Sequence, residues 1–478
     1  MDRSGVTFGT SGARGRVEDM TDEVCHAYTL AFLQHLAQSG RLEGTAAVAV
    51  GGDLRPSTPR IMGAVAQAAA DRGHRVINCG PLPSPALALY GLEQSIPAIM
   101  VTGSHIPADR NGIKFNAPEG EILKAGEAAI RAQQVEWPLS GASSFSIPEV
   151  DPAAINRYVS RYLDFFPANS LAGLRLGVYE HSSVARDILP AILEGLGAEV
   201  VRLGRSDIFI PVDTEAIRPE DVALARRWVS EHRLDSIIST DGDADRPLVS
   251  DEKGNWLRGD VLGIICARFL GADTVVTPVS SNTAAEKSGF FRRVVRTRIG
   301  SPYVIEGMQQ AMAAGGKRVV GYEANGGFLT AGAVERQGRV LAPLPTRDAV
   351  IVLLSLLMAA RGHGSISCLV GSLPARFTAS GRVKDFPTEI AREKVQALLA
   401  GGTELEEVKA VLAPQCGQLA AVDGTDGARL TFEDGDIVHF RPSGNAPELR
   451  CYVEAGRDER TQRLLIACTE WINKWSRD

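Results

Sequence analysis

Short apolar runs alternate with helix-length segments over the first three quarters of the chain, and this alternation constrains the fold more than any other feature. Strands separated by helices of this length predict parallel β-α-β units, whose strands end at one edge of a sheet. The alternation restarts after a polar link at residues 139–152 and again near Gly259, which predicts three α/β modules. From about residue 372 the pattern changes, and a smaller α+β module is expected.

Composition narrows the class of protein. The length of 478 residues and the apolar fraction of 44% are enough for several packed cores, so three or four domains are expected. A net charge of −6 without any Lys/Arg-rich run argues against nucleic acid or an anionic membrane as partner. No apolar stretch is long enough to span a bilayer, and the N-terminus lacks an apolar signal region. The seven cysteines are scattered without a C-x-x-C pair, so we expect a reducing cytoplasm and neither a disulfide framework nor a zinc site.

One apolar run, residues 96–101, ends in a tight turn that reads Thr-Gly-Ser-His-Ile-Pro at residues 102–107. Ser104 therefore follows a predicted buried strand, with His105, an arginine and Lys114 close by. A hydroxyl ringed by positive charge suits a covalent phosphoryl group. Taken alone, His105 is more typical of a packed core histidine.

A second run, residues 236–239, leads into a turn rich in carboxylates. Asp241, Asp243 and Asp245 can converge there on one hard divalent cation, and oxygen ligands favour Mg²⁺ over zinc. A calcium-binding EF-hand is an alternative, because a glutamate stands at its twelfth position. That reading fails at the sixth position, which needs glycine and holds Arg246. A solvated acidic turn is the remaining alternative.

Two later loops carry polar residues on glycine-rich turns. Glu323 and Asn325 could hydrogen-bond adjacent hydroxyls of a sugar, and a plain strand-end turn is the alternative. Residues 441–447 read Arg-Pro-Ser-Gly-Asn-Ala-Pro, whose small residues, donors and guanidinium suit a phosphate. A Pro/Gly turn with one exposed arginine is the alternative there. The candidate residues of this fourth loop are Arg441, Ser443, Gly444, Asn445 and, just beyond it, Arg450.

Two stretches near the N-terminus also carry charged residues. Residues 8–15 are glycine-rich and contain Arg14, but they do not open a β-α-β unit after a strand, so a dinucleotide-binding fingerprint is not expected. Residues 52–57 follow the first apolar strand. The plainest interpretation of Arg55 is a salt bridge to Asp53 at the start of a helix.

In this order, the loops resemble those of the α-D-phosphohexomutase superfamily, and the resemblance covers essentially the whole chain. It implies an α/β protein with three consecutive mixed α/β/α sandwich domains of similar topology and a smaller C-terminal α+β domain around a central cleft. The implied domains are residues 1–148, 149–257, 258–368 and 369–478.

The resemblance also implies roles for single residues. Ser104 matches the phosphorylated serine, and Ser104, Asp241, Asp243 and Asp245 match the Mg²⁺ ligands. Glu323 and Asn325 match the sugar-binding loop, and Arg441, Ser443, Gly444, Asn445 and Arg450 fall in or beside the phosphate-binding loop. Arg14, His105, Lys114 and Arg246 match positions around the reacting centre.

Three loops depart from the usual family pattern. Ile106 stands where the serine loop usually has asparagine. Asn325-Gly326-Gly327 replaces Ser-Gly-His in the sugar loop, and Asn445-Ala446 replaces Thr-Glu in the phosphate loop. Because the serine, the three aspartates, the glutamate and the loop arginine are all present, these departures concern the choice of substrate.

The implied reaction is reversible transfer of a phosphoryl group between the C6 and C1 oxygens of a hexose phosphate, through a hexose 1,6-bisphosphate intermediate that also acts as activator. Lys114, His105 and Arg14 are the candidates for the general base. The expected partner is the small-molecule hexose phosphate, and the expected state is a monomer or homodimer in the cytoplasm. Reorientation of the bisphosphate further implies a mobile fourth domain.

The sugar loop is similar to that of a branch of bacterial phosphomannomutases that serve GDP-mannose and polysaccharide synthesis, which favours mannose phosphates. Glucose and glucosamine phosphates are the alternatives within the family. A phosphatase with Asp241 as nucleophile and a non-catalytic sugar-phosphate binder are alternatives from other classes.

Overall fold

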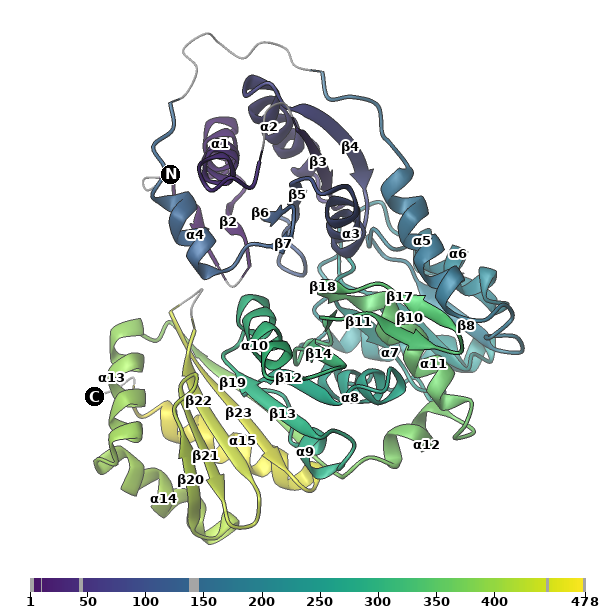
Figure 1. The fold of residues 1–478 in the computed structure, drawn as a ribbon. Coiled ribbons are helices and arrows are strands. Elements are labelled where there is room, and N and C mark those ends of the chain that lie inside the picture. The colour runs from purple at the N-terminus through teal and green to yellow at the C-terminus, as the bar shows by residue number, and fades with distance from the viewer. Residues whose placement is uncertain (1–3, 10, 43–45, 137–145, 444–446, 476–478) are drawn as a thin grey trace.

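The computed structural model describes residues 4–9, 11–42, 46–136, 146–443 and 447–475. Three α/β modules follow one another along the chain, and a smaller α+β module lies beside the third (Figure 1). This is the predicted fold class, which is confirmed. Among the described residues, no helix combines the length and the apolar character needed to cross a membrane.

The first module is built on a seven-stranded sheet with the order β1-β2-β6-β5-β3-β4, and β7 pairs with β6. Side chains of β3 alternate between two cores: Val48 and Val50 enter the core formed with α1 and α2, and Ala49 enters the core shared with later modules. The elements are β1 (Thr7–Phe8), β2 (Ala13–Arg16), α1 (Asp22–Gln38), β3 (Ala47–Gly52), α2 (Thr58–Asp71), β4 (Arg75–Pro81), α3 (Ser84–Gln94), β5 (Ala98–Val101), β6 (Arg110–Ala117), β7 (Gly120–Glu121) and α4 (Lys124–Arg131).

The second and third modules contain a four-stranded and a five-stranded sheet. The second consists of α5 (Ala153–Phe165), β8 (Arg175–Tyr179), α6 (Ile188–Gly195), β9 (Glu199–Leu203), α7 (Pro219–His232), β10 (Ser236–Thr240) and β11 (Pro247–Val249). The third consists of α8 (Gly259–Phe269), β12 (Thr274–Pro278), α9 (Ala284–Lys287), β13 (Arg293–Thr297), α10 (Ser301–Ala313), β14 (Val319–Tyr322), β15 (Phe328–Thr330), β16 (Val334–Arg336), β17 (Arg339–Leu341), β18 (Leu344–Asp348), α11 (Ala349–Ala360) and α12 (Ile366–Gly371).

One strand arrangement recurs in all three modules. Three parallel strands are followed by a fourth, antiparallel one, in the spatial orders β6-β5-β3-β4, β11-β10-β8-β9 and β15-β14-β12-β13. The alternation of runs and helices predicted the parallel strands but not the antiparallel partners. As a result, the connection between the third and fourth strands occupies the same place in each module. The loops that contain Ser104, Asp241 and Glu323 are these three connections.

The fourth module is an antiparallel five-stranded sheet with the order β19-β23-β22-β21-β20. Its elements are β19 (Phe377–Lys384), α13 (Thr388–Ala400), α14 (Thr403–Cys416), β20 (Leu419–Asp423), β21 (Ala428–Phe432), β22 (Ile437–Pro442), β23 (Glu448–Ala455) and α15 (Asp458–Ile472). Alternating side chains of its strands and the apolar faces of α13, α14 and α15 form a separate core. Each of the four larger sheets draws its strands from one predicted domain, whereas the boundaries themselves stay predictions.

Hydrophobic contact continues across the first three modules. A single core cluster contains Met100 of β5, Val178 of β8 and Val320 of β14, together with most of α11. The apolar helix α11 is preceded by Asp348, whose carboxylate caps it by accepting a hydrogen bond from the Val350 amide. Because α11 is packed inside this cluster, its apolar character is explained by core burial.

Candidate active site

Ser104 lies in the loop between β5 and β6, buried and with its backbone in the left-handed region at φ 56°. A non-glycine residue rarely adopts this conformation unless its surroundings hold it there, and such residues cluster at functional sites. The Ser104 amide donates to Thr102 Oγ1 at 2.8 Å, and Thr102 Oγ1 donates to Asp53 Oδ2 at 2.8 Å. Asp53, which directly follows β3, therefore stabilises the Ser104 loop through these hydrogen bonds.

Arg55 fixes the same loop through its backbone. Its guanidinium donates to the carbonyl oxygens of Ser104 at 2.9 Å and of Pro107 at 2.7 Å, and it also reaches those of Ile106 and Arg110. The expected salt bridge to Asp53 is present at 3.1 Å. Its role extends well beyond the start of the helix, because one buried side chain satisfies four carbonyl groups of the Ser104 loop.

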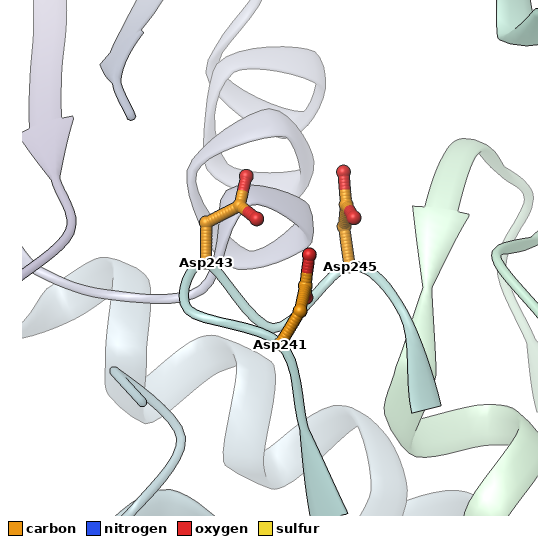
Figure 2. A group of neighbouring side chains, drawn as sticks. All are labelled: Asp241, Asp243 and Asp245. Atoms are coloured by element: carbon orange, nitrogen blue, oxygen red, sulfur yellow. The ribbon is translucent and has the colours of Figure 1, made fainter. Parts of the chain in front are cut away.

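Asp241, Asp243 and Asp245 extend to the same side of the loop between β10 and β11 (Figure 2). One carboxylate oxygen from each lies within 4.8 Å of the others, and all three residues are buried. Among the described residues, Asp243 Oδ1 and Asp245 Oδ1 have no hydrogen-bond partner. Buried, unpaired carboxylate oxygens that converge in this way fit an oxygen-ligated divalent cation such as Mg²⁺.

Two observations bear on this acidic loop. Glu252, the residue that would complete an EF-hand, instead accepts hydrogen bonds from the Ser367 amide and hydroxyl, at the far end of β11. At Gly242, an added Cβ would lie 2.7 Å from the carbonyl oxygen of Ser104. Glycine is thus needed where the acidic loop of the second module meets the serine loop of the first.

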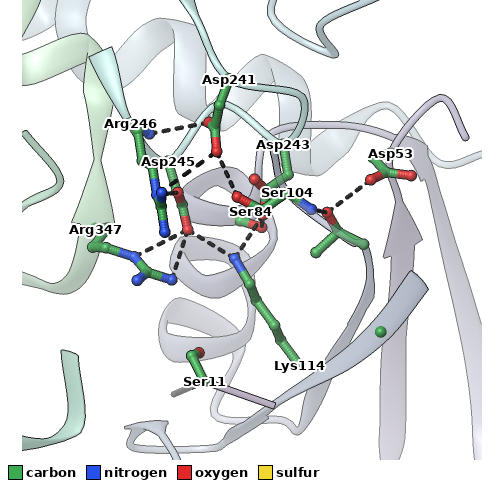
Figure 3. A network of polar contacts seen from close by, with 12 residues as sticks. Ser11, Asp53, Ser84, Ser104, Lys114, Asp241, Asp243, Asp245, Arg246 and Arg347 are labelled. Atoms are coloured by element: carbon green, nitrogen blue, oxygen red, sulfur yellow. Dashed lines mark hydrogen bonds and ion pairs between the residues drawn. The ribbon is translucent and has the colours of Figure 1, made fainter. Parts of the chain in front are cut away.

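Three side chains of the first module reach the acidic loop (Figure 3). Ser104 Oγ donates to Asp241 Oδ2 at 2.6 Å, and Ser84 Oγ at the start of α3 donates to Asp243 Oδ2 at 2.7 Å. Lys114 Nζ on β6 donates to Asp243 at 2.6 Å and to Asp245 at 2.7 Å. Serine, lysine and carboxylates therefore form one connected cluster. Ser84 was not identified from the sequence, where only its place at a predicted helix start distinguishes it.

Burial and the charges within this cluster shift the pKa values of its members in different directions. Burial, together with the charges of Asp243 and Asp245, raises the pKa of Asp241 well above its ordinary value. Burial acts the same way on Asp243, but the adjacent Lys114 ammonium outweighs it and lowers the pKa of Asp243. Burial opposes the charge on Lys114 as well, yet the two carboxylates raise its pKa. A bound divalent cation would relieve the repulsion between the three carboxylates.

His105, Arg246 and Arg14 surround the Ser104 hydroxyl and the acidic loop. His105 Nδ1 lies 3.2 Å from Ser104 Oγ, and burial, then Arg246, lowers the pKa of His105 well below its ordinary value. Among the described residues, Nε and Nη1 of the buried Arg246 have no hydrogen-bond partner. Burial and the charge of Arg246 also lower the pKa of the half-buried Arg14 to about 10. The two guanidinium groups beside the serine hydroxyl are suited to an anion.

The sugar-loop candidates occupy different positions. Glu323 is buried and pairs with Arg347, whose Nη1 lies 3.1 Å from its carboxylate. Asn325 Oδ1 accepts a hydrogen bond from the Gly327 amide at 2.9 Å, so its side chain stabilises its own turn. Arg347 was missed in the sequence. The only signal was a charged Arg-Asp pair immediately before the most apolar helix.

The phosphate-loop candidates lie in the fourth module. Arg441 Nε donates to Asp426 Oδ2 at 2.9 Å and lines a cavity of about 260 Å³ with Arg298 and Tyr303 of the third module. The Ser443 amide donates to the Glu448 carbonyl, while Gly444, Asn445 and Ala446 lie outside the described residues. Arg450 contacts Glu448 at 3.6 Å. No contact among the described residues joins Arg441 to the cluster around Ser104.

Comparison with known proteins agrees with this architecture. Models of the phosphoglucomutase/phosphomannomutase domains match in order: alpha/beta/alpha domain I at residues 5–136, domain II at 156–254, domain III at 258–377 and the C-terminal domain at 391–467. A phosphomannomutase of Sinorhizobium fredii is 45% identical over 468 residues, covering 96% of this chain and 97% of the relative. A phosphomannomutase of Salmonella muenchen is 44% identical over 464 residues, covering 96% and 94%.

A crystal structure of a phosphoglucomutase/phosphomannomutase family protein from Burkholderia thailandensis has the same fold, with a TM-score of 0.72 at 19% identity over 98% of this chain and 97% of that one. Four domain models in sequence and two relatives aligned over nearly their full length leave one assignment: this chain belongs to the phosphoglucomutase/phosphomannomutase family.

Proposed function

We propose that this protein is a phosphomannomutase, which interconverts mannose 6-phosphate and mannose 1-phosphate through a phosphorylated Ser104 and a hexose 1,6-bisphosphate. The observation that carries the proposal is the contact of the Ser104 hydroxyl with Asp241 at 2.6 Å, inside a cluster of acidic and basic groups. The names of the two relatives at 45% and 44% identity support mannose as the sugar. Phosphoglucomutase and phosphoglucosamine mutase are the alternatives within the family.

In this proposal Asp241, Asp243 and Asp245 hold Mg²⁺ together with the phosphorylated Ser104. The ion would supply neutralisation of negative charge on the phosphoryl oxygens during transfer. Lys114 keeps Asp243 and Asp245 oriented towards that position. The guanidinium of Arg246, whose Nε lies 3.7 Å from Asp245 Oδ1 and 3.9 Å from Asp241 Oδ2, would donate to the same oxygens.

The sugar hydroxyl that attacks phosphorylated Ser104 must lose its proton to a nearby base. His105, Lys114 and Arg14 all belong to the cluster, and His105 Nδ1 lies nearest to the serine at 3.2 Å from Oγ. Glu323 would accept hydrogen bonds from sugar hydroxyls, with Asn325 shaping its turn. Arg441, Ser443 and Arg450, with Gly444 and Asn445, would hold the phosphate that does not react. Such a site must accept either end of the bisphosphate, so the substrate reverses its direction between the two transfers.

The decisive experiment is a coupled assay of the purified protein with Mg²⁺ and a trace of hexose 1,6-bisphosphate. Mannose 1-phosphate, glucose 1-phosphate and glucosamine 1-phosphate are compared as substrates. Conversion of mannose 1-phosphate with the highest kcat/KM supports the proposal, and preference for another sugar reassigns the substrate. Release of inorganic phosphate that survives Ser104→Ala would establish a phosphatase instead, and binding without turnover would establish a sugar-phosphate binder.

We also propose that the enzyme works in the cytoplasm, as a monomer or homodimer. All seven cysteines are free thiols, and all except Cys368 are buried. This arrangement needs no oxidising compartment for folding. Size-exclusion chromatography with light scattering would distinguish the two oligomeric states.

A further inference from the structure

Gly327, the residue immediately before β15, lacks a side chain for a reason that its backbone does not explain. Its φ lies outside the left-handed region, whereas the preceding Gly326 has a φ of +88°. An added Cβ at Gly327 would lie 2.5 Å from Cδ, 2.6 Å from Cγ and 3.0 Å from Cβ of Arg347. These atoms belong to the inner part of the arginine side chain and cannot swing away freely. Gly327 is therefore small because Arg347 passes over it.

Arg347 joins two of the loops that form the site. Its Nε and Nη2 lie 3.1 and 2.9 Å from Asp245 Oδ2 (Figure 3). Its Nη1 lies 3.1 Å from Glu323 Oε2. The first carboxylate belongs to the acidic loop of the second module and the second to the sugar loop of the third. One planar guanidinium thus sets the position of Glu323 relative to the acidic loop.

Asp348, the residue after Arg347, is held in place by several contacts. Asp348 accepts hydrogen bonds from the hydroxyls of Tyr158, at 2.7 Å, and Tyr162, both on α5 of the second module. It also caps α11 and lies opposite Phe328 in the pairing of β18 with β15. These contacts fix the backbone that follows Arg347, and from there the arginine side chain passes over Gly327 into the site.

We propose that Arg347 is the positioning residue of the sugar site, which holds Glu323 for the substrate hydroxyls, and that Gly327 is required to admit it. This inference rests on the proposed function and deepens it. Residue 327 is where the sugar loop usually has histidine, a side chain whose Cβ the position of Arg347 excludes. The pair Gly327–Arg347 therefore acts as one unit, and neither residue can be exchanged alone.

The test is a double-mutant cycle on the full-length enzyme with Arg347→Ala, Gly327→Ala and the combined variant. Each single change should raise the KM for mannose 1-phosphate by about tenfold or more, because Glu323 loses its charged hydrogen-bond partner. In the combined variant the defect should be no larger than in Arg347→Ala, since the alanine at 327 then has nothing to displace. The Mg²⁺ concentration for half-activation should not rise, because Arg347→Ala removes a positive charge from beside Asp245.

Matched controls separate this role from general damage. Gly63→Ala on α2 adds a Cβ that meets no described atom within 4 Å beyond the backbone of its own helix and its chain neighbours, and Arg339→Ala removes hydrogen bonds to the carbonyls of Asp164 and Phe166 far from the site. Both should leave KM unchanged. Arg347→Lys retains one positive charge and should give an intermediate KM, which provides a second variant if Arg347→Ala fails to fold.

Three outcomes would overturn the inference: wild-type KM in Gly327→Ala, defects that multiply in the combined variant, or a Mg²⁺ requirement that rises in parallel with KM. If the wild-type enzyme converts no hexose phosphate, the proposed function fails instead. The same cycle is then measured by calorimetry as the Kd for mannose 1-phosphate. Equal affinity of wild type and Arg347→Ala in that measurement also overturns the inference.

Discussion

The hydroxyl of Ser104 lies 2.6 Å from a carboxylate oxygen of Asp241, although 137 residues separate the two in the sequence. The serine belongs to the first sheet and the aspartate to the second. The proposed phosphate carrier therefore meets its proposed metal site only when two modules are packed together. Gly242, which leaves room for the Ser104 carbonyl, is part of the same junction.

Replacing Ser104 tests the phosphate carrier directly. Ser104→Ala removes the only atom that can carry the phosphoryl group in the proposed mechanism, and kcat should fall by about a thousandfold or more. Intact-mass spectrometry should find one phosphoryl group on the wild-type protein and none on the variant. Ser39→Ala, at the exposed end of α1, is the control and should keep both the group and the activity. An unchanged phosphorylated mass in Ser104→Ala would place the carrier elsewhere.

Removing the metal should both stop turnover and lower stability. Three buried carboxylates repel one another, and a cation that binds only the folded state stabilises it by about 2.7 kcal/mol at a hundredfold excess over its Kd. Adding Mg²⁺ to chelated protein should therefore raise Tm, as followed by differential scanning fluorimetry. Asp243→Asn should abolish most of this shift. A variant that responds to Mg²⁺ like the wild type would contradict the assignment of the site.

Arg55 should matter for activity without touching the substrate. Arg55→Met removes one donor from each of four loop carbonyls and the guanidinium partner from the buried Asp53, and breaking such a buried pair should cost about 3–5 kcal/mol of folding free energy. The Ser104 backbone would also lose the support that keeps it left-handed, so kcat should fall more than KM changes. Urea unfolding and steady-state kinetics measure the two effects. A stable variant with wild-type kcat would show that the loop holds its own shape.

Because His181 is buried, the protein should lose stability in mild acid. It is fully buried beside Tyr179, and burial lowers its pKa from 6.5 to about 4. Because the folded-state pKa lies below the unfolded one, the fold favours the neutral ring. That contribution is complete above pH 6.5 and disappears as pH falls to about 4. It amounts to roughly 3 kcal/mol.

Asparagine at this position removes the titrating group and tolerates the backbone φ of 27°. The unfolding free energy of His181→Asn should therefore depend less steeply on pH between 6.5 and 4 than that of the wild type. Urea titrations at several pH values give the two slopes. Equal slopes would mean that the pKa of His181 is the same in the folded and the unfolded protein.

Each of the three loops could be located from the sequence because each follows an apolar strand, but their strands belong to three different sheets, so their convergence was implied only by the family resemblance. Arg347 could not be predicted in this way, since Asp245 lies 102 residues and Glu323 lies 24 residues away in the sequence. For Arg55, only the salt bridge to Asp53 could be predicted. Its other partners are backbone carbonyls, which every residue has, so the sequence does not indicate which of them Arg55 binds. The antiparallel strand β6 was hidden for a related reason: its polar Asn111, Lys114 and Asn116 face partners inside the protein, which disguises a buried strand as a loop.

The hydrophobic cluster that runs through the first three modules decides how the protein comes apart. Modules that share one core cannot lose it separately, so these three should unfold in a single cooperative transition in spite of their repeated topology. The fourth module has a core of its own and can open while the rest remains folded. On heating, the fourth module, which begins near residue 372, should therefore unfold separately from the first three. The first three modules should unfold together although they share one topology.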